Sequence, residues 1–348
     1  MIQNREKSSI LLIYTGGTIG MKEDPAIQAL RPFDFSQILA EVPELRKFAY
    51  KIDSYTFEPL IDSSDVDPLN WVTLASLIED RYDDYDGFVI LHGTDTKAYS
   101  ASALSFMIEG LTKPVIFTGS QIPIGVPRTD GKENLISAVE IAAAKDSEGH
   151  ARVPEVCICF DNVLMRGNRT TKINSDNFRA FRSENFPPLA EAGISIRYND
   201  ALIIKPADWK ARPLFHKNLD TRVSILKIHP GITPQVAKGI LCGEESRAVI
   251  METYGAGNAP SRGWFLDIVK EAAGMGKILM NVTQCIAGSV NMDIYATGKS
   301  LKELGIVNGY DSTTESALGK LFYLLGEIED NATVKTMLEP DLRGEISK

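Results

Sequence analysis

The chain has 348 residues, of which 44% are hydrophobic and 24% charged, and its formal net charge is −9. This acidic balance, without a long basic run, argues against nucleic acid and anionic membrane surfaces as partners. No apolar stretch approaches the roughly 20 residues that span a bilayer, and the short apolar run near the N-terminus does not have the pattern of a signal peptide. We therefore expect a cytoplasmic protein without a metal site, in which Cys157, Cys159, Cys242 and Cys285 are reduced thiols.

The first half of the chain alternates short aliphatic runs with amphipathic segments. Buried strands are predicted at Ser9–Tyr14, Gly87–Leu91, Pro114–Thr118 and Glu155–Phe160. Helices are predicted at Phe35–Leu45 (interrupted or ended near Pro43), Asn70–Arg81, Lys97–Glu109 and Asn134–Lys145. The polar stretch Met21–Phe33 is interpreted as a mobile loop. This β-α-β-α order predicts a parallel sheet with helices on both faces.

An irregular segment with several prolines, from about Pro187 to Asn218, is interpreted as a linker. Beyond it, strands are predicted at Val223–Ile228, Ala248–Thr253 and Lys277–Val282, and helices at Thr233-Pro234 onward, at Gly263–Ala273 and from the capping box Ser312–Glu315 to about Ile328. Because the chain is long for one core, two domains are expected. The predicted fold class is α/β, with a larger N-terminal parallel-sheet catalytic domain (1–195), a linker (196–218) and a smaller, Rossmann-like C-terminal α/β domain (219–348).

The first predicted strand leads directly into TGGTIG, in which Thr15 and Thr18 bracket Gly16 and Gly17. Two adjacent glycines allow a positive φ and a close approach of the backbone to a neighbouring group. The pattern is not G-x-G-x-x-G, so it does not indicate a dinucleotide site. A strand-to-helix turn without function is the alternative interpretation of this short motif.

Polar clusters follow several of the predicted strands. They are Thr15/Thr18, Thr94/Asp95, Thr118/Ser120 and, after a shorter apolar stretch, Asp62–Asp65. Each cluster by itself is compatible with ordinary turn chemistry, which favours Ser, Thr and Asp. In a parallel sheet the carboxyl ends of the strands meet at one edge, so these side chains are expected to converge on a site.

A threonine hydroxyl is a weak nucleophile and needs a base to remove its proton. His92 precedes a glycine at a buried strand end, where a hydrogen-bonded structural histidine is favoured over a catalytic one. A lysine can act as the base when its surroundings lower its pKa. Lys172, in the polar stretch Arg166–Lys172, is the candidate, although composition alone favours a solvated surface lysine.

Six motifs resemble those of the bacterial type I, cytoplasmic L-asparaginases. They are TGGTIG (15–20), DSSD (62–65), HGTDT (92–96), RGNRTTK (166–172), YGAGNAP (254–260) and NVTQC (281–285). The resemblance covers essentially the whole chain. It implies a two-domain α/β fold, hydrolysis of the small molecule asparagine to aspartate and ammonia without a cofactor, and assembly as a homodimer or homotetramer.

The resemblance also implies roles for individual residues. Thr18 is the expected nucleophile, and Thr94, Asp95 and Lys172 form a second catalytic cluster. Ser63 and Ser64 are expected to bind the α-carboxylate of the substrate, and Asp95 its α-ammonium group. Asn258 is expected to reach the site of a neighbouring subunit.

Two positions depart from the family pattern. The loop after Thr18 lacks the tyrosine that helps to activate this threonine, which leaves its base open unless a tyrosine such as Tyr295 arrives from elsewhere. Glu252 stands where some relatives carry an arginine for an allosteric asparagine, and its carboxylate would repel the effector. We therefore expect no allosteric site of that kind.

Two other functions stay open at the level of the sequence. One is an asparaginase with substantial glutaminase activity, because a single methylene in the substrate changes the free energy by only about 1–3 kcal/mol. The other is a catalytically idle amino-acid-binding homologue, for which the missing loop tyrosine is the only support. A transamidosome subunit is disfavoured because no basic extension for tRNA is present.

Overall fold

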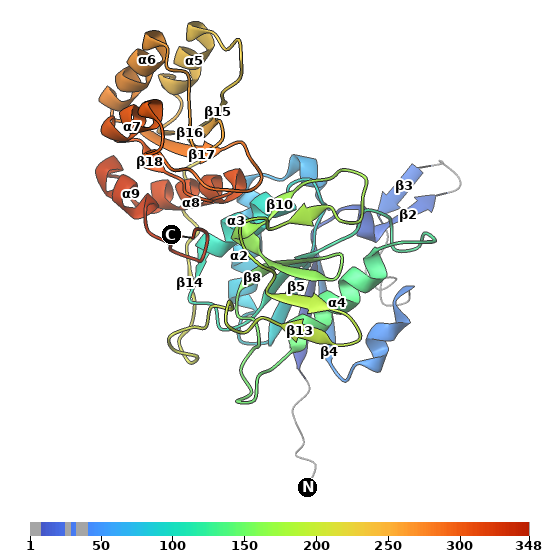
Figure 1. Cartoon of the computed structure of the whole chain (residues 1–348). Helices are drawn as coiled ribbons and strands as arrows, with labels where there is room; N and C mark the ends of the chain where they lie inside the picture. The colour runs from blue at the N-terminus through green and yellow to red at the C-terminus, as the bar shows by residue number, and fades with distance from the viewer. Residues whose placement is uncertain (1–7, 25–28, 33–40, 348) are drawn as a thin grey trace. The chain divides into compact units, whose positions relative to one another are not determined.

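The computed structural model describes residues 8–24, 29–32 and 41–347. The chain divides into two compact units (Figure 1). The first unit comprises Met1–Ser183 and Pro187–Phe215, and the second comprises Glu184–Phe186 and His216–Lys348. Within the described residues no helix is both long enough and apolar enough to cross a membrane.

The first unit is built on an eight-stranded sheet in the order β13-β12-β9-β8-β7-β5-β1-β4. The strands are β1 (Ser9–Tyr14), β4 (Lys51–Thr56), β5 (Gly87–Leu91), β7 (Val115–Thr118), β8 (Val156–Phe160), β9 (Val163–Arg166), β12 (Ala190–Ala192) and β13 (Ile196–Tyr198). The five from β4 to β8 are parallel, and β9, β12 and β13 continue the sheet in antiparallel fashion.

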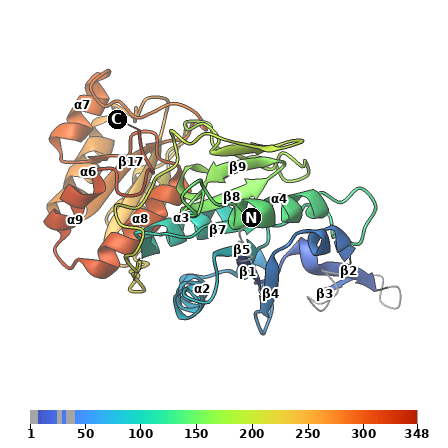
Figure 2. The ribbon, with the colours of Figure 1, turned by 90° about the horizontal axis from the view of Figure 1, so that it is seen from below.

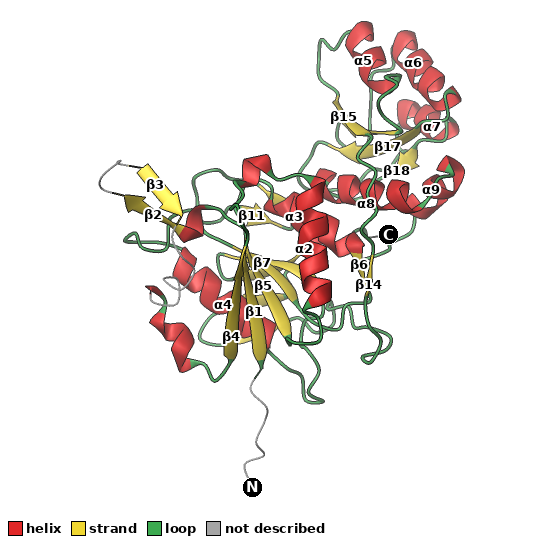
Figure 3. Ribbon diagram, turned by 180° about the vertical axis from the view of Figure 1, so that it is seen from behind, coloured by secondary structure: helices red, strands yellow, loops and turns green. Residues whose placement is uncertain are grey.

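Helices cover this sheet on both sides. Helix α4 (Gly131–Ala143) packs against β1, β5, β7 and β8, while α2 (Pro68–Asp80) and α3 (Lys97–Met107) pack against each other on the other side (Figures 2 and 3). Strands β5, β7 and β8 are buried along their whole length. Their continuous aliphatic sequences follow from this double cover, because a strand buried on both faces has no solvent side.

The register of the parallel strands sets the position of the site. Tyr14, the last residue of β1, lies opposite Leu91 of β5, and Leu91 lies opposite Thr118 of β7. The chain therefore leaves all three strands at the same level of the sheet. The turns that begin at Thr15, His92 and Gly119 are neighbours for this reason.

The second unit has a four-stranded parallel sheet in the order β15-β16-β17-β18. Its strands are β15 (Val223–Lys227), β16 (Ala248–Thr253), β17 (Ile278–Thr283) and β18 (Val307–Asn308), and its helices are α5 (Pro234–Leu241), α6 (Gly263–Gly274), α7 (Ala296–Glu303), α8 (Thr314–Glu327) and α9 (Asn331–Leu338). Residues of β16 alternate between two cores: Val249 and Met251 pack with α5 and α6, whereas Ala248 and Ile250 pack with α8 and α9. The expected α/β class is confirmed for both units.

Most predicted strands and helices are confirmed to within a few residues, but two predictions need correction and a third is largely untested. The helix predicted at Lys97–Glu109 ends at Met107, and Ile108–Glu109 is strand β6, paired with β14 (Leu214–Phe215). The stretch interpreted as a loop contains β2 (Met21–Asp24) and β3 (Ala29–Pro32), which pair as an antiparallel hairpin. The helix predicted at Phe35–Leu45 falls mainly outside the described residues, and Pro43–Lys47 is a short 3-10 helix.

The segment 196–218, expected to be a linker, belongs almost entirely to the first unit. A buried ion pair between Glu155 and Arg166 holds it there. The Arg166 guanidinium donates to the Leu202 carbonyl at 2.7 Å, and the Ile204 N–H donates to Glu155 at 2.7 Å. The prolines of this segment thus mark an irregular strand-and-turn path across the first unit rather than a free connection.

Candidate active site

The turn after β1 is shaped by its two glycines. Gly16 and Gly17 have φ values of 137° and 93°, a region that side chains rarely adopt. A Cβ atom on Gly16 would overlap the Ile61 carbonyl, and one on Gly17 would overlap the backbone of Gly93. The glycines therefore allow the turn to lie directly against the segment before Asp62 and against the turn after β5.

The hydroxyls at the strand ends differ in whether they are already hydrogen-bonded within the protein. Thr15 is buried and donates to the Leu91 carbonyl at 3.0 Å, and Thr118 donates to the Cys159 carbonyl at 2.8 Å. Thr18, at the start of a 3-10 helix (Thr18–Gly20), is only half-buried. Its hydroxyl makes no hydrogen bond within the described part of the chain, so it is free to approach a ligand.

Ser63 lies beside the turn after β5, and Ile61 of the same segment contacts the turn after β1. Ser63 is buried, and its Oγ accepts a hydrogen bond from the Asp95 N–H at 3.3 Å, while the Thr96 hydroxyl donates to the Ser63 carbonyl at 2.6 Å. A Cβ atom on Gly93 would overlap the Ser63 side chain. Ser64 is exposed, and both its N–H and its hydroxyl donate to the Asp62 carboxylate, at 2.9 and 3.0 Å.

Lys172 comes to this cluster from a separate hairpin. Strand β10 (Thr171–Lys172) pairs with β11 (Phe181–Arg182), and the Lys172 amine donates to Thr94 Oγ1 at 2.9 Å and to Asp95 Oδ1 at 2.7 Å. The Lys172 side chain is 18% exposed, whereas Asp95 is 63% exposed. The lysine is thus directed inward to a threonine hydroxyl and is not a solvated surface lysine. Its carboxylate partner stays open to a cation from solution.

His92 is neutral and its ring is fully engaged. Burial lowers the pKa of its imidazole to about 4. Nδ1 lies 2.7 Å from the Gly93 carbonyl, which can only accept, so Nδ1 carries the proton. Nε2 then accepts from the Ser100 hydroxyl at 3.0 Å, and Ser100 accepts from Trp71 Nε1 at 2.8 Å. Since both ring nitrogens are occupied, His92 fixes the turn and has no free nitrogen for proton transfer.

Sequence analysis missed the groups that support the turn after β7. The Asp130 carboxylate accepts from the N–H groups of Gln121 and Ile122 at 3.0–3.1 Å. Asn134 of α4 donates to the Gly119 carbonyl at 3.0 Å. Lys97, the first residue of α3, also lies behind this turn. Its position immediately after HGTDT, at the start of an otherwise largely apolar helix, is the signal that could have revealed it.

Three predicted or discussed residues belong to the second unit. Asn258 is half-buried, and its Oδ1 accepts from the Ala259 N–H at 3.1 Å. Glu252 accepts from the Thr314 hydroxyl at 2.7 Å and lies 3.5 Å from the Lys227 amine. Tyr295 is 51% exposed. The suggestion that Tyr295 replaces the loop tyrosine stays a prediction, and the described residues offer Thr18 no hydrogen-bonded base.

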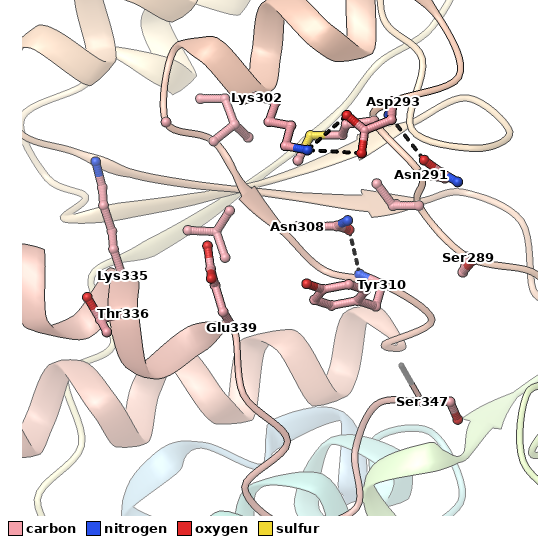
Figure 4. Close-up of a pocket in the computed structure, with 15 residues that line it drawn as sticks. Ser289, Asn291, Asp293, Lys302, Asn308, Tyr310, Lys335, Thr336, Glu339 and Ser347 are labelled. Atoms are coloured by element: carbon pink, nitrogen blue, oxygen red, sulfur yellow. Dashed lines mark hydrogen bonds and ion pairs between the residues drawn. The ribbon is translucent and has the colours of Figure 1, made fainter.

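The second unit also contains an open cavity of about 780 Å³ beside β18 (Figure 4). Its polar lining includes the Asp293–Lys302 ion pair, with Asn308, Lys335 and Glu339. None of the predicted site residues lines it. Among the described residues no group of three or more His, Cys, Asp or Glu side chains is placed to hold a metal ion.

Known proteins match this chain over nearly its whole length. The family described as "Asparaginase, N-terminal" matches residues 9–203, and "Glutaminase/Asparaginase C-terminal domain" matches residues 222–338. L-asparaginase 1 of Escherichia coli is 44% identical over 98% of this chain and 99% of its own length. The 60 kDa lysophospholipase of Mus musculus is 39% identical, over 97% of this chain and 62% of its own. The crystal structure of L-asparaginase I from Vibrio cholerae superposes with a TM-score of 0.88 at 40% identity, covering 98% of this chain and 100% of that one.

Proposed function

Because this chain belongs to the asparaginase family, we propose that it is an amidohydrolase that converts asparagine to aspartate and ammonia. The observation that carries the proposal is the position of the Lys172 amine, between the Thr94 hydroxyl and the Asp95 carboxylate. A lysine next to a hydroxyl and a carboxylate can hold and pass on a proton, which amide cleavage requires.

In the proposed mechanism the Thr18 hydroxyl attacks the side-chain carboxamide carbon. The Thr18 hydroxyl proton passes to the amide nitrogen, the tetrahedral oxyanion collapses with cleavage of the carbon–nitrogen bond, ammonia leaves, and an ester to Thr18 remains. Water then attacks the ester, its proton passes by way of the Thr94 hydroxyl to the Thr18 oxygen, and aspartate leaves as the threonine hydroxyl is restored. The Lys172 amine, which donates to Thr94 Oγ1, holds this hydroxyl in position for the relay.

The amino-acid end of the substrate fits the charges around this cluster. The exposed Asp95 carboxylate can pair with the α-ammonium group, and Ser63, with Ser64 beside it, can bind the α-carboxylate by hydroxyl and backbone N–H groups. Backbone N–H groups of the turn at Thr94 would stabilise the oxyanion, and each such donor is worth about 3–4 kcal/mol in comparable sites. We propose that Asn258 contributes to the site of a neighbouring subunit.

The experiment is ammonia release from asparagine and glutamine, measured side by side over a range of concentrations. Saturable release from asparagine is expected, and Thr18→Ala should bind asparagine without turning it over. Binding without turnover in the unmodified protein would instead support the idle amino-acid-binding homologue, and comparable rates on glutamine would support the dual-specificity enzyme. Because the Glu252 carboxylate is expected to repel the α-carboxylate of an effector asparagine, the dependence of rate on asparagine concentration should be hyperbolic. A sigmoidal curve that Glu252→Ala abolishes would contradict this.

We further propose a cytoplasmic homodimer or homotetramer. The resemblance to the type I enzymes supports this assembly. So do three apolar side chains that are more than half exposed on the segment after β17, namely Ile286, Ile294 and Tyr295. Light scattering on the purified protein measures its mass, and a strict monomer at micromolar concentration would rule out this part of the proposal.

A further inference from the structure

A second lysine lies behind the proposed site, and the mechanism above does not use it. Lys97 is the first residue of α3 and is completely buried. Its amine has no hydrogen-bond partner among the described residues. A buried amine without a partner is costly to a fold, so its retention next to a reactive cluster needs a physical reason.

The surroundings of the Lys97 amine are aromatic and backbone groups. Nζ lies 4.5 Å from the ring centre of Phe160 on β8 and 5.1 Å from that of Phe181 on β11. A Cβ atom built on Gly119 would come within 2.8 Å of the same nitrogen. The amine therefore fills the space between the sheet, the β10–β11 hairpin and the turn after β7.

Two of these contacts lead directly to the proposed catalytic group. Phe181 is the residue opposite Lys172 in the β10–β11 pair. Lys97 itself follows Thr96, whose hydroxyl holds the Ser63 carbonyl, in the same turn as Thr94 and Asp95. The side chain of Lys97 thus contacts β11, the strand paired with the one that carries Lys172, and its backbone continues the turn that Lys172 binds.

The charged and titratable groups that face this amine come from four elements. Asp130, before α4, favours the protonated amine, whereas Lys172 on β10 opposes it. Cys159 on β8 is a neutral thiol because burial raises its pKa to about 12, and His92 after β5 is a neutral imidazole. The N-terminus of α3 carries a partial positive charge, which further disfavours a cation at its first residue.

We propose that Lys97 is a positioning residue of the Thr94–Asp95–Lys172 group, and that its buried amine supports the β10–β11 hairpin and the Gly119 turn in the arrangement that the reaction needs. This inference rests on the proposed function. Protonation of Lys97 places an ammonium ion in a buried space close to Lys172, where the attraction of the two rings for a cation offsets only part of the desolvation cost. The pair of like charges then disfavours the native packing of Phe181 and, through it, the position of Lys172.

The supporting titration falls in a measurable range. Burial, the largest cause, lowers the pKa of the Lys97 amine from 10.5 to about 7. The amine is therefore neutral above pH 7 and gains its charge below it. The acid limb of kcat/KM for asparagine should accordingly have an apparent pKa near 7, although His92 stays neutral throughout this range.

The test is the pH profile of ammonia release between pH 5.5 and 9 for three proteins: unmodified, Lys97→Met and Lys113→Met. Methionine keeps the length of the chain at position 97 but cannot take up a proton. The ratio of kcat/KM in Lys97→Met to kcat/KM in the unmodified protein should rise about tenfold from pH 8 to pH 6. This is the factor by which the neutral fraction of a single group with a pKa near 7 falls over that range.

Lys113→Met is the control. The Lys113 amine is half-buried, its pKa is also lowered, and it donates to the backbone carbonyls of Tyr82 and Tyr85. Replacing Lys113 should therefore leave the acid limb of the kcat/KM profile unchanged.

A ratio of kcat/KM values that stays constant with pH, or an acid limb that persists in Lys97→Met, would overturn the proposal.

A second measurement does not depend on turnover. In protein labelled with ¹⁵N at the lysine amines, NMR should show one signal that titrates near pH 7 and is missing from Lys97→Met, with the Lys172 signal shifting in parallel. If the unmodified protein releases no ammonia at any pH, the proposed function fails, and this spectrum still decides the role of Lys97. If the Lys172 signal is identical in the unmodified protein and in Lys97→Met at every pH, the positioning role of Lys97 is refuted.

Discussion

Lys172 shows how one side chain gains a reactive setting from residues far away in sequence. Its amine bonds Thr94 and Asp95, which lie 78 and 77 positions before it. The lysine is mostly enclosed while Asp95 is mostly open, so the pair combines a held amine with an accessible carboxylate. The amine is in reach of a hydroxyl that could relay a proton, and the carboxylate is in reach of a bound ammonium group.

Replacing Lys172 should therefore remove activity without removing the fold. We expect Lys172→Met to lower kcat for asparagine by about 10²–10⁴-fold, the usual contribution of a positioned proton-transfer group. The melting temperature should change little, because an ion pair with an exposed partner adds at most about 1 kcal/mol. Steady-state kinetics and thermal unfolding measure both quantities.

Lys145→Met is the matched control. Lys145 also pairs with an aspartate, Asp86, at 2.7 Å, but at the amino end of β5, opposite to the end that carries the cluster. Its replacement should leave kcat within about twofold. Equal losses in the two variants would mean that the Thr94–Asp95 contact of Lys172 is not catalytic.

At the scale of the element, the turns after β1 and β5 fit together because neither carries a Cβ atom at the contact. Gly17 packs on the Gly93 backbone, and Gly93 packs on Ser63. This chain of contacts brings the Thr18 turn against the Thr94 turn. The glycines thus act in tertiary packing as well as in the local turn.

Gly17→Ala should be strongly destabilising. Its φ of 93° with ψ of 173° is a region essentially restricted to glycine and costs a side chain about 1–3 kcal/mol, and the added methyl group also overlaps the Gly93 backbone. Gly110→Ala is the comparison, because Gly110 has a φ of 73° but nothing within 4 Å of the added atom. Denaturant unfolding should show a loss of about 1 kcal/mol for Gly110→Ala and at least twice that for Gly17→Ala. Similar losses of unfolding free energy in the two variants would show that backbone strain alone accounts for both, without a contribution from the overlap with Gly93.

Helix capping in the second unit shows the limit of a motif taken by itself. The capping box was predicted to begin at Ser312, but the cap of α8 is Thr313, whose hydroxyl accepts from the Ser316 N–H at 3.1 Å. The sequence Ser-Thr-Thr offers three hydroxyls in a row, and each is an acceptable cap. Packing of α8 on its sheet, rather than propensity, selects the register.

At the scale of the whole molecule, a buried charge pair helps to hold the segment that precedes the second unit within the first unit. Glu155 and Arg166 are 8% and 4% exposed, and they hold the backbone of 202–204 in the first unit. Removing one partner of such a pair leaves an uncompensated buried charge, which costs about 3–5 kcal/mol. The pair fixes the middle of the segment 196–215, whose two ends are held by the pairing of β13 with β12 and of β14 with β6.

We expect Glu155→Ala to lower the free energy of unfolding by about 3–5 kcal/mol and to expose the segment around Ile204 to proteolysis. Glu191→Ala is the control, because Glu191 forms an exposed pair with Arg197 on the neighbouring strands β12 and β13. Its loss should cost less than about 1 kcal/mol. Urea unfolding and limited proteolysis test the comparison, and protection of Ile204 in Glu155→Ala would contradict it.

The sequence by itself determined the elements and the motifs. The apolar runs of β1, β5, β7 and β8 are continuous and bounded by turn residues, so the local pattern was sufficient to predict these strands. The same pattern was sufficient to predict that Thr18, Thr94 and Asp95 follow the ends of strands. Short strands such as β9, β12 and β14 were missed because runs of four, three and two residues carry only a weak pattern, and β14 in addition pairs with β6, which is distant in sequence.

Only the tertiary structure decided which polar groups are available and which are committed. It showed Thr15 bonded to the backbone, both ring nitrogens of His92 hydrogen-bonded, Lys172 directed inward, and Lys97 buried with no hydrogen-bond partner in the described part of the chain. The physical reason is that the state of a polar side chain depends on the donors, acceptors and solvent around it. Here those surroundings come from strands and turns that are adjacent only after the sheet has formed.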